Sequence, residues 1–353
     1  MNMPPEETEE QRSAKAWADV QARAALRRVK ECNRSLDGMR EFDDPRHGKI
    51  FVTKHVYALI EKNRQESCPQ KSPAWYKRRT CFITGSMFAT VCNANPYEKR
   101  SVALRKKTGQ EKPFQGNKAT EHGNKYEHEA LLRYEKLTGA KVLEFGLMES
   151  LNEGEHFLAA SPDGITSSGR LIEIKCPYRR IPKKEIPKHY KYQIQFMMHI
   201  FRLAKCDFIQ YVPETELMAE VFIVTTEDYD PWFFYSRFAI AKSFWEEVLL
   251  IREQRAQMDE AELEAEREAQ REAERKKEEM LRKREENYGD KSDLALRWCD
   301  AEPLYNTKDG CAPEFVPKLR AQPLNLDIAR NRIEERKQQQ QEEEEEQVQE
   351  CLL

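Results

Sequence analysis

Asp163, Glu173 and Lys175 are the residues whose types and spacing most clearly suggest chemistry. Asp163 lies in a Ser-Pro-Asp-Gly segment at 161–164, and the other two lie in Glu-Ile-Lys-Cys-Pro at 173–177. Two carboxylates that approach each other repel unless a proton or a cation lies between them. Mg²⁺ or Mn²⁺ prefers oxygen ligands and can activate water against a phosphodiester. The spacing therefore predicts a metal-dependent enzyme that cuts nucleic acid.

These residues must be held by strands. Residues 156–160 and 171–174 are apolar or alternating, and a turn-rich segment at 166–169 separates them, a pattern typical of a β-hairpin. Because successive side chains of a strand point to opposite faces, Glu173 and Lys175 should share one face. Ile172 and Ile174 should then point into the core.

A third acid, Glu127, precedes the hairpin. Residues 123–138 have the periodicity of an amphipathic helix, and Glu127 lies at the edge of its apolar stripe. A second helix is expected from 188 to 201, followed by strands at 208–212 and 219–224. The expected order is helix, three strands, helix, two strands.

This order, with Glu on the first helix, Asp before the hairpin turn and Glu-x-Lys after it, resembles the PD-(D/E)xK nuclease superfamily. The finer motifs resemble the lambda-exonuclease type, also called the YqaJ-like viral recombinase family, over about residues 72–255. The matching blocks are Trp-Tyr-Lys-Arg-Arg at 75–79, Ile-Thr-Gly-Ser at 83–86, Gly-x-x-Tyr-Glu at 123–127, the two segments named above, and Gln-x-Gln at 193–195. The resemblance implies an α/β fold with a restriction-endonuclease-like core, in which helices flank a mixed central sheet.

The resemblance also implies roles for the acids. Asp163, Glu173 and the backbone carbonyl of Ile174 would bind metal, and Glu127 would bind a second ion directly or through water. One or two Mg²⁺ or Mn²⁺ ions are therefore expected. Lys175 would orient or deprotonate the attacking water.

Other matched residues are expected to contact substrate. Gln193 would position substrate or water. Arg79 and Ser86 match a pocket for a terminal 5′ phosphate, and the neighbouring Lys77 and Arg78 are expected to bind phosphate or DNA, because a guanidinium suits a phosphate dianion.

Members of the family digest one strand of duplex DNA from its 5′ end, work with a single-strand annealing protein, and in several members form a ring of three subunits. The resemblance therefore implies a 5′-to-3′ exonuclease that acts on double-stranded DNA ends in recombination or repair. A homotrimer and an annealing partner are expected only on this ground.

Charge is distributed unevenly along the chain. The formal net charge is -3, yet residues 71–125 contain twelve Lys or Arg against three Glu, and residues 170–191 contain eight against two acids. Basic segments without a base-reading motif favour sequence-independent binding to a phosphate backbone. They are consistent with a DNA-binding core.

Several classes are disfavoured by the composition. No apolar run approaches a membrane span, and the N-terminal residues resemble neither a signal nor a transit peptide. The nine cysteines include no C-x-x-C pair, which argues against a zinc or iron-sulfur site and favours a reducing compartment. No phosphate-binding Gly-x-x-x-x-Gly-Lys loop is present. An intracellular protein without membrane partners, in nucleus or cytoplasm, is expected.

The chain is expected to divide into five parts. These are a disordered acidic N-terminus at 1–12, a helical extension at 13–70, the nuclease core at 71–255, a charged single helix at 256–288, and an extended arm with an acidic low-complexity tail at 289–353.

Two alternatives stay open. A structure-specific endonuclease could use the same metal centre, but it would need no pocket for a free 5′ end. A non-catalytic scaffold that binds DNA ends could keep the fold, but it would gain nothing from adjacent carboxylates that repel phosphate.

Overall fold

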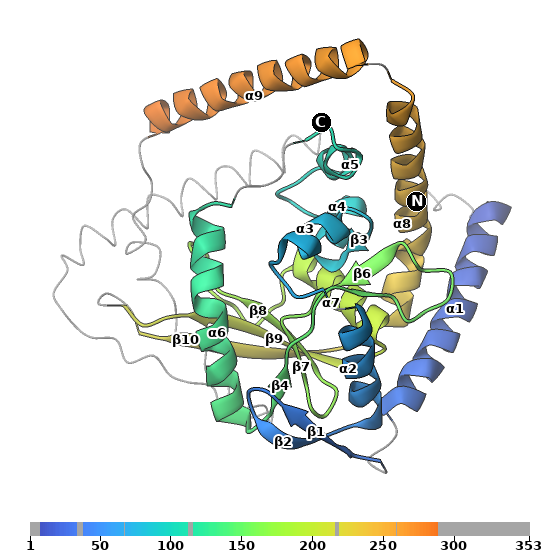
Figure 1. Cartoon of the computed structure of the whole chain (residues 1–353), viewed down its shortest axis with the longest axis vertical. Coiled ribbons are helices and arrows are strands. Elements are labelled where there is room, and N and C mark those ends of the chain that lie inside the picture. The colour runs from blue at the N-terminus through green and yellow to red at the C-terminus, as the bar shows by residue number, and fades with distance from the viewer. Residues whose placement is uncertain are drawn as a thin grey trace, which may run out of the picture.

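The computed structural model describes residues 8–33, 38–66, 68–111, 116–215, 219–258 and 260–288. The predicted arm and acidic tail at 289–353 lie outside these ranges. Within them a mixed sheet is flanked by helices, with helical N-terminal elements and a long charged helix near the end of the described chain (Figure 1). The predicted fold class is confirmed.

The central sheet has five strands in the order β10-β9-β8-β7-β4. Its strands are β4 (Val142–Leu143), β7 (Gly164–Thr166), β8 (Leu171–Lys175), β9 (Lys205–Val212) and β10 (Val221–Asp228). β8 and β9 are parallel, whereas the other neighbouring pairs are antiparallel. The sheet therefore places β8, which carries Glu173 and Lys175, at its centre.

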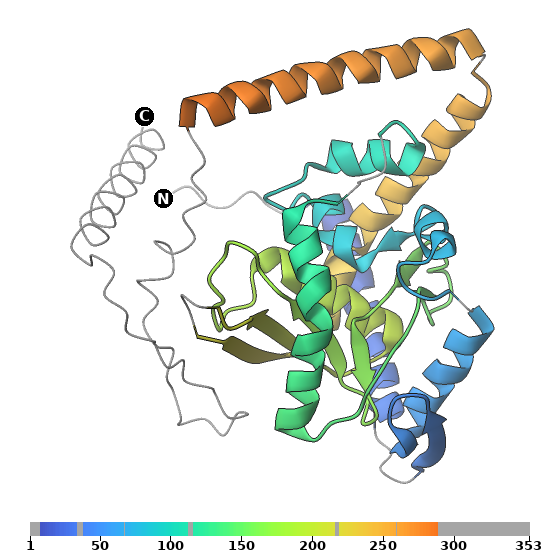
Figure 2. The ribbon, with the colours of Figure 1, turned by 60° about the vertical axis from the view of Figure 1, so that its left-hand side comes forward.

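Helices cover both faces of this sheet. α7 (Lys188–Phe201) is the crossover between β8 and β9, and α6 (Lys118–Thr138) lies on the opposite face (Figures 1 and 2). Leu171 is buried in the core cluster that contains α7, whereas Ile172 and Ile174 are buried with α6 residues. Both faces of β8 are thus covered, as is usual for a central strand with parallel pairing.

Helix α6 begins five residues earlier than the sequence periodicity predicted. The side chain of Asn117 caps it by accepting a hydrogen bond from the backbone nitrogen of Thr120 at 2.9 Å. The helix ends at Gly139, which adopts a left-handed conformation with φ of 70°. Ala130, Leu131 and Tyr134 form its buried stripe.

A smaller sheet corrects the predicted hairpin. β6 (Leu158–Ala160) pairs with β3 (Ile83–Thr84) and β5 (Met148–Glu149), not with β8. The hairpin arms are β7 and β8, so five strands rather than three lie between α6 and α7. The prediction was wrong because residues 156–166 contain two short strands separated by residues 161–163, and the second pairs with β8.

The N-terminal extension also differs from the prediction. α1 (Glu9–Asn33) begins inside the segment predicted to be disordered, and β1 (Arg40–Asp44) and β2 (Gly48–Val52) form a hairpin before α2 (Lys54–Glu66). Phe42, Ile50 and Val52 are buried at alternating positions, and this short alternation explains why strands form there. The extension at 13–70 is therefore not purely helical.

The remaining helices connect these layers. They are α3 (Pro73–Arg79), α4 (Gly85–Val91), α5 (Arg100–Thr108), α8 (Pro231–Ala256) and α9 (Glu260–Tyr288). Asp230 caps α8 by accepting hydrogen bonds from two backbone nitrogens, and Trp17 of α1 contacts the rings of Tyr235 and Phe238 on α8. In α9, pairs such as Lys276–Glu272 at 2.6 Å lie four residues apart, as expected for a solvated charged helix. Among the described residues, no helix is long and apolar enough to span a membrane.

Candidate active site

Asp163 is fixed at the edge of β8. Its Oδ2 accepts a hydrogen bond of 2.6 Å from the backbone nitrogen of Ile174. The next residue, Gly164, has no room for a side chain, because a Cβ atom there would lie 2.3 Å from Val142 Cγ1. Asp163 is therefore fixed by the hydrogen bond to β8 and by the close packing of the following residue, Gly164, against the Val142 side chain.

The same hydrogen bond defines the direction of the Ile174 carbonyl. In a strand, the N–H and C=O groups of one residue face the same neighbour. The N–H of Ile174 faces Asp163, so its C=O faces the edge of β8 at which the Asp163 carboxylate lies. Ile174 also lines cavities on both sides of Glu127.

Lys175 and Gln193 both contact Glu173. Glu173 Oε1 accepts hydrogen bonds from Lys175 Nζ and, at 2.7 Å, from Gln193 Nε2 of α7. The side chain of Glu173 is only 1% exposed. Its second oxygen, Oε2, is buried and has no hydrogen-bond partner in the described part of the chain. A buried acceptor without a partner is costly and suggests a missing ligand.

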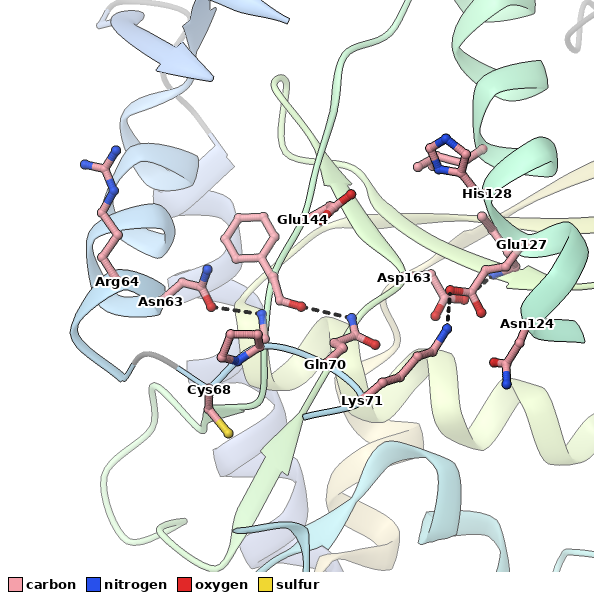
Figure 3. Close-up of a pocket in the computed structure, with 15 residues that line it drawn as sticks. Asn63, Arg64, Cys68, Gln70, Lys71, Asn124, Glu127, His128, Glu144 and Asp163 are labelled. Atoms are coloured by element: carbon pink, nitrogen blue, oxygen red, sulfur yellow. Dashed lines mark hydrogen bonds and ion pairs between the residues drawn. The ribbon is translucent and has the colours of Figure 1, made fainter. Parts of the chain in front are cut away.

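Glu127 lies opposite these residues on α6. Its Oε1 forms an ion pair with Lys71 Nζ at 3.2 Å. Figure 3 shows Lys71 reaching toward Glu127, with Asp163 beside them. As they stand, no three His, Cys, Asp or Glu side chains of the described residues form a group that could hold a metal ion. Lysines and a backbone N–H instead occupy the carboxylate oxygens.

Burial and mutual repulsion perturb these acids. The pKa of Asp163 is raised well above its ordinary value, first by burial and then by the charge of Glu173. Burial also raises the pKa of Glu173, against the opposing effect of Lys175. For Lys175, burial alone would lower the pKa, but the charges of Glu173 and Asp163 raise it. A cation bound beside them would stabilise the charged form of both carboxylates and so lower both pKa values.

Two cavities meet at Glu127. One of about 640 Å³ lies between α2 and α6 and is lined by Lys71, Glu127 and Asp163 (Figure 3). The other, of about 1190 Å³, is lined by Ser86, Lys175 and Gln193 and by the basic loop at 178–180. Asn124, Glu127 and Ile174 line both cavities. Glu127 thus lies where the two cavities adjoin, and Asp163 lies on the wall of the smaller one.

Arg79 and Ser86 are in contact, as a shared phosphate pocket requires. Arg79 Nη2 donates to Ser86 Oγ at 2.9 Å, and the guanidinium lies over the Trp75 ring at 4.2 Å from its centroid. Burial lowers the pKa of Arg79 to about 10. Trp75 Nε1 also donates to Ser161 Oγ at 2.8 Å, which links this pocket to the segment carrying Asp163.

The other two basic residues of the predicted pocket are placed differently. Arg78 Nη2 lies 3.1 Å from a carboxylate oxygen of Glu66 and 2.8 Å from one of Glu149. Its guanidinium therefore joins α2 to β5 within the protein, and its role in binding phosphate or DNA stays a prediction. Lys77 is exposed on α3, and its role in binding phosphate or DNA stays a prediction.

Sequence reasoning missed Lys71 and Lys107. Lys107 Nζ donates to the backbone carbonyl of Arg79, and its pKa is lowered to about 7 by burial and by the charges of Arg79 and Arg252. The sequence shows Lys107 only as one of several bases in a row. Gln195, in contrast to Gln193, is buried against Glu227 and the start of α8 and does not reach the acids.

A known viral protein is similar to part of this chain. The relative "Uncharacterized protein R354" of Acanthamoeba polyphaga mimivirus is 35% identical over 159 residues, which are 40% of this chain and 29% of that protein. The chain thus spans under a third of the length of this relative.

Solved structures are similar over about half of the chain. The alkaline exonuclease LHK-Exo from Laribacter hongkongensis is 24% identical, with a TM-score of 0.44 over 52% of this chain and 95% of that chain. A phage-related exonuclease from Haemophilus somnus 129PT is 15% identical, with a TM-score of 0.35 over 49% of this chain and 96% of that one. The profile of the YqaJ-like viral recombinase domain matches residues 74–206, the segment that contains Arg79, Glu127, Asp163, Glu173 and Lys175. Residues 74–206 therefore form a YqaJ-like viral recombinase domain, as the ordered motifs predicted.

Proposed function

We propose that the protein is a divalent-metal-dependent 5′-to-3′ exonuclease that acts on the ends of duplex DNA. The observation that carries this proposal is the unpartnered Oε2 of buried Glu173 beside the carboxylate of Asp163 and the ammonium of Lys175. The buried Glu173, the half-buried Asp163 and the lysine provide metal ligands and a proton-transfer group together.

The residues present fit a hard divalent ion. Asp163, Glu173 and the carbonyl of Ile174 would hold it, and Glu127 would hold a second ion or a water of the first. Mg²⁺ or Mn²⁺ bound there would acidify a ligated water and neutralise charge on the phosphorus oxygens. The fit rests on the orphaned Glu173 oxygen and on the raised pKa values of Asp163 and Glu173, because both call for a cation.

Lys175 and Gln193 serve the reaction from the Glu173 side. Both donate to the same oxygen of Glu173 and therefore fix that carboxylate. The Lys175 ammonium also lines the larger cavity, where it can stabilise negative charge on the phosphate and orient the attacking water. Gln193 lines this cavity as well and can orient the substrate.

The 5′ polarity is supported by the Arg79–Ser86 pair. A guanidinium and a hydroxyl 2.9 Å apart suit a terminal phosphate dianion. Ser86 and Lys175 line the same cavity, so a strand whose 5′ phosphate binds at Ser86 would present a nearby phosphodiester to Lys175. Water attacks phosphorus, the P–O3′ bond breaks, and the shortened strand keeps a new 5′ phosphate.

Such a product prepares DNA for recombination. Removal of the 5′ strand leaves a 3′ overhang, which is the substrate of a single-strand annealing protein. We propose a role in recombination or repair with such a partner, and homo-oligomerisation as in the resembled family.

The proposal is tested by digestion of linear duplex DNA labelled separately at each 5′ and 3′ end, with and without a 5′ phosphate, in Mg²⁺ and in EDTA. Covalently closed circular duplex is the control. We expect Mg²⁺-dependent loss of the 5′-phosphorylated strand and an intact circle. Nicking of the circle would favour the endonuclease, and tight binding without cleavage would favour the end-binding scaffold.

A further inference from the structure

Lys71 is held in an unusual backbone conformation next to the acids. Its φ of 62° places it in the left-handed region, which residues other than Gly, Asn and Asp rarely adopt. Lys71 lies outside the sequence motifs that resemble the nuclease family. Such a conformation persists only where the surrounding structure fixes it.

The neighbours of Lys71 supply this constraint. Gln70 Nε2 donates to the carbonyl of Phe145 at 2.9 Å and to that of Pro162 at 2.7 Å. Ser72 Oγ caps α3 by accepting from Trp75 N at 3.1 Å. Both sides of Lys71 are thus anchored, and one anchor is the residue that directly precedes Asp163.

The anchored backbone directs the ammonium toward the acids. Lys71 Nζ lies 3.2 Å from Glu127 Oε1, and Figure 3 shows it pointing toward Glu127 and Asp163. The site has an excess of carboxylates over other cations, since Lys175 is engaged with Glu173. Lys71 therefore supplies positive charge where Glu127 would otherwise meet Asp163 uncompensated.

We propose that Lys71 is a displaceable cation: it neutralises Glu127 while no metal is bound, and it turns to a DNA phosphate when metal takes Glu127. This inference rests on the proposed function. Metal ligation through Glu127 Oε1 would place a divalent ion next to the Lys71 ammonium, which lies 3.2 Å from the same oxygen. Repulsion between the two cations would then drive Lys71 from its present contact.

The released Lys71 side chain can turn into the adjoining cavity. Lys71 is 47% exposed, and it lines the 640 Å³ cavity with Gln70, Asn124 and His128. This cavity does not include Ser86, which lines the other cavity with Lys175. If the 5′-terminal nucleotide lies on the Ser86 side of the acids, the strand beyond the scissile bond enters the cavity of Lys71, where the ammonium meets its phosphates.

Calorimetric titration of the full chain with Mn²⁺, without DNA, tests whether Lys71 competes with metal for Glu127. Lys71→Asn removes the charge but tolerates the left-handed backbone, Lys71→Arg keeps the charge, and Lys205→Asn is the matched control. Lys205 pairs with Asp228 at 2.6 Å and is 50% exposed, close to the value for Lys71, but it lines neither of the two cavities at Glu127.

We expect Lys71→Asn to bind Mn²⁺ about fivefold more tightly than wild type, the order of an exposed ion pair that the metal no longer has to break. Lys71→Arg and Lys205→Asn should bind like wild type. Unchanged or weaker binding by Lys71→Asn would overturn the inference and leave a merely structural ion pair.

Asp163→Asn separates this result from the proposed function. If wild type binds no Mn²⁺, or if Asp163→Asn binds it as wild type does, the metal site itself fails and the inference on Lys71 fails with it. If Asp163→Asn loses Mn²⁺ and Lys71→Asn shows wild-type affinity, only the inference on Lys71 fails.

DNA binding tests whether the released Lys71 contacts a DNA phosphate. Affinity for a 5′-phosphorylated duplex is measured against salt with Ca²⁺, which occupies oxygen sites, and in EDTA. Lys71→Asn should lower the salt slope by about one in Ca²⁺ and leave it unchanged in EDTA, because one phosphate contact is lost only when Lys71 is free. An equal slope to wild type in Ca²⁺ would contradict the phosphate contact.

Discussion

Asp163 Oδ2 accepts a hydrogen bond of 2.6 Å from the backbone nitrogen of Ile174, so the acid before β7 is fixed to the strand that carries Glu173 and Lys175. This bond converts residues eleven apart in sequence into one site. It also places the Asp163 carboxylate at the strand that carries Glu173, as the proposed metal site requires. The predictions below follow from this arrangement.

Removal of the Glu173–Lys175 pair should separate cleavage from binding. The double variant Glu173→Gln, Lys175→Met deletes both partners of the ion pair, so neither is left as a buried charge without its partner and the chain should stay folded. Cleavage should fall by at least about 10²- to 10⁴-fold, the size of a lost proton-transfer group, while DNA affinity changes little. Initial rates and fluorescence anisotropy measure the two effects. Mg²⁺-dependent cleavage retained by the purified double variant would refute the site.

Gly164→Ala should displace Asp163. A Cβ atom at 164 would lie 2.3 Å from Val142 Cγ1, so the backbone after Asp163 must move. We expect a loss of about 1–3 kcal/mol in the free energy of unfolding, typical of overpacking, and a loss of cleavage. Gly123→Ala in α6 is the control for stability, since its Cβ would meet nothing within 4 Å. That variant should be stabilised by up to about 1 kcal/mol; a stable, active Gly164→Ala would refute the packing argument.

Arg79→Ala should weaken the preference for phosphorylated ends. Its guanidinium contacts Ser86 and is buried over Trp75, and a lost charged hydrogen bond costs about 1.5–3 kcal/mol, or about 10- to 100-fold in rate. The measurement compares digestion of 5′-phosphate and 5′-hydroxyl duplexes. Arg105→Ala, an exposed base paired with Glu111, should leave the ratio unchanged. Equal loss on both substrates by Arg79→Ala would remove the pocket assignment.

Lys107 should make stability depend on pH. Its folded-state pKa is lowered to about 7, whereas the pKa of a lysine in the unfolded chain is about 10.4. Between these values the unfolded chain binds a proton that the folded chain does not, so stability contributed by this group rises with pH and is lost as pH falls toward about 7. The free energy of unfolding of wild type relative to Lys107→Met should therefore rise by about 1–3 kcal/mol from pH 7 to 10. Urea unfolding across this range measures the difference in free energy between the two proteins. A difference that stays constant with pH would contradict the lowered pKa of Lys107.

The parts of the site that the sequence predicted are those set by local pattern. Alternation along β8 predicts that Glu173 and Lys175 share a face, and their contact shows it. Apolar periodicity predicts α7 at its observed bounds, which brings Gln193 to Glu173.

The missed parts depend on contacts distant in sequence. The position of Lys71 is set by bonds from Gln70 to residues 75 and 92 positions away, and Arg78 is drawn to Glu149 across 71 positions. No local pattern encodes either pairing. The strand before Asp163 was misassigned for the same reason, since its partners are β3 and β5.

Identification of the first product released from a 5′-phosphorylated linear duplex tests the central claim most directly. The duplex is digested in Mg²⁺ with an EDTA control, and mass spectrometry identifies the early products. We predict mononucleotides with a 5′ phosphate and a 3′ hydroxyl, released in order from the 5′ end and only with Mg²⁺, because hydrolysis breaks the P–O3′ bond next to the Arg79–Ser86 pocket. Products from the 3′ end, internal oligonucleotides or 3′-phosphorylated nucleotides would contradict the proposed 5′-to-3′ exonuclease.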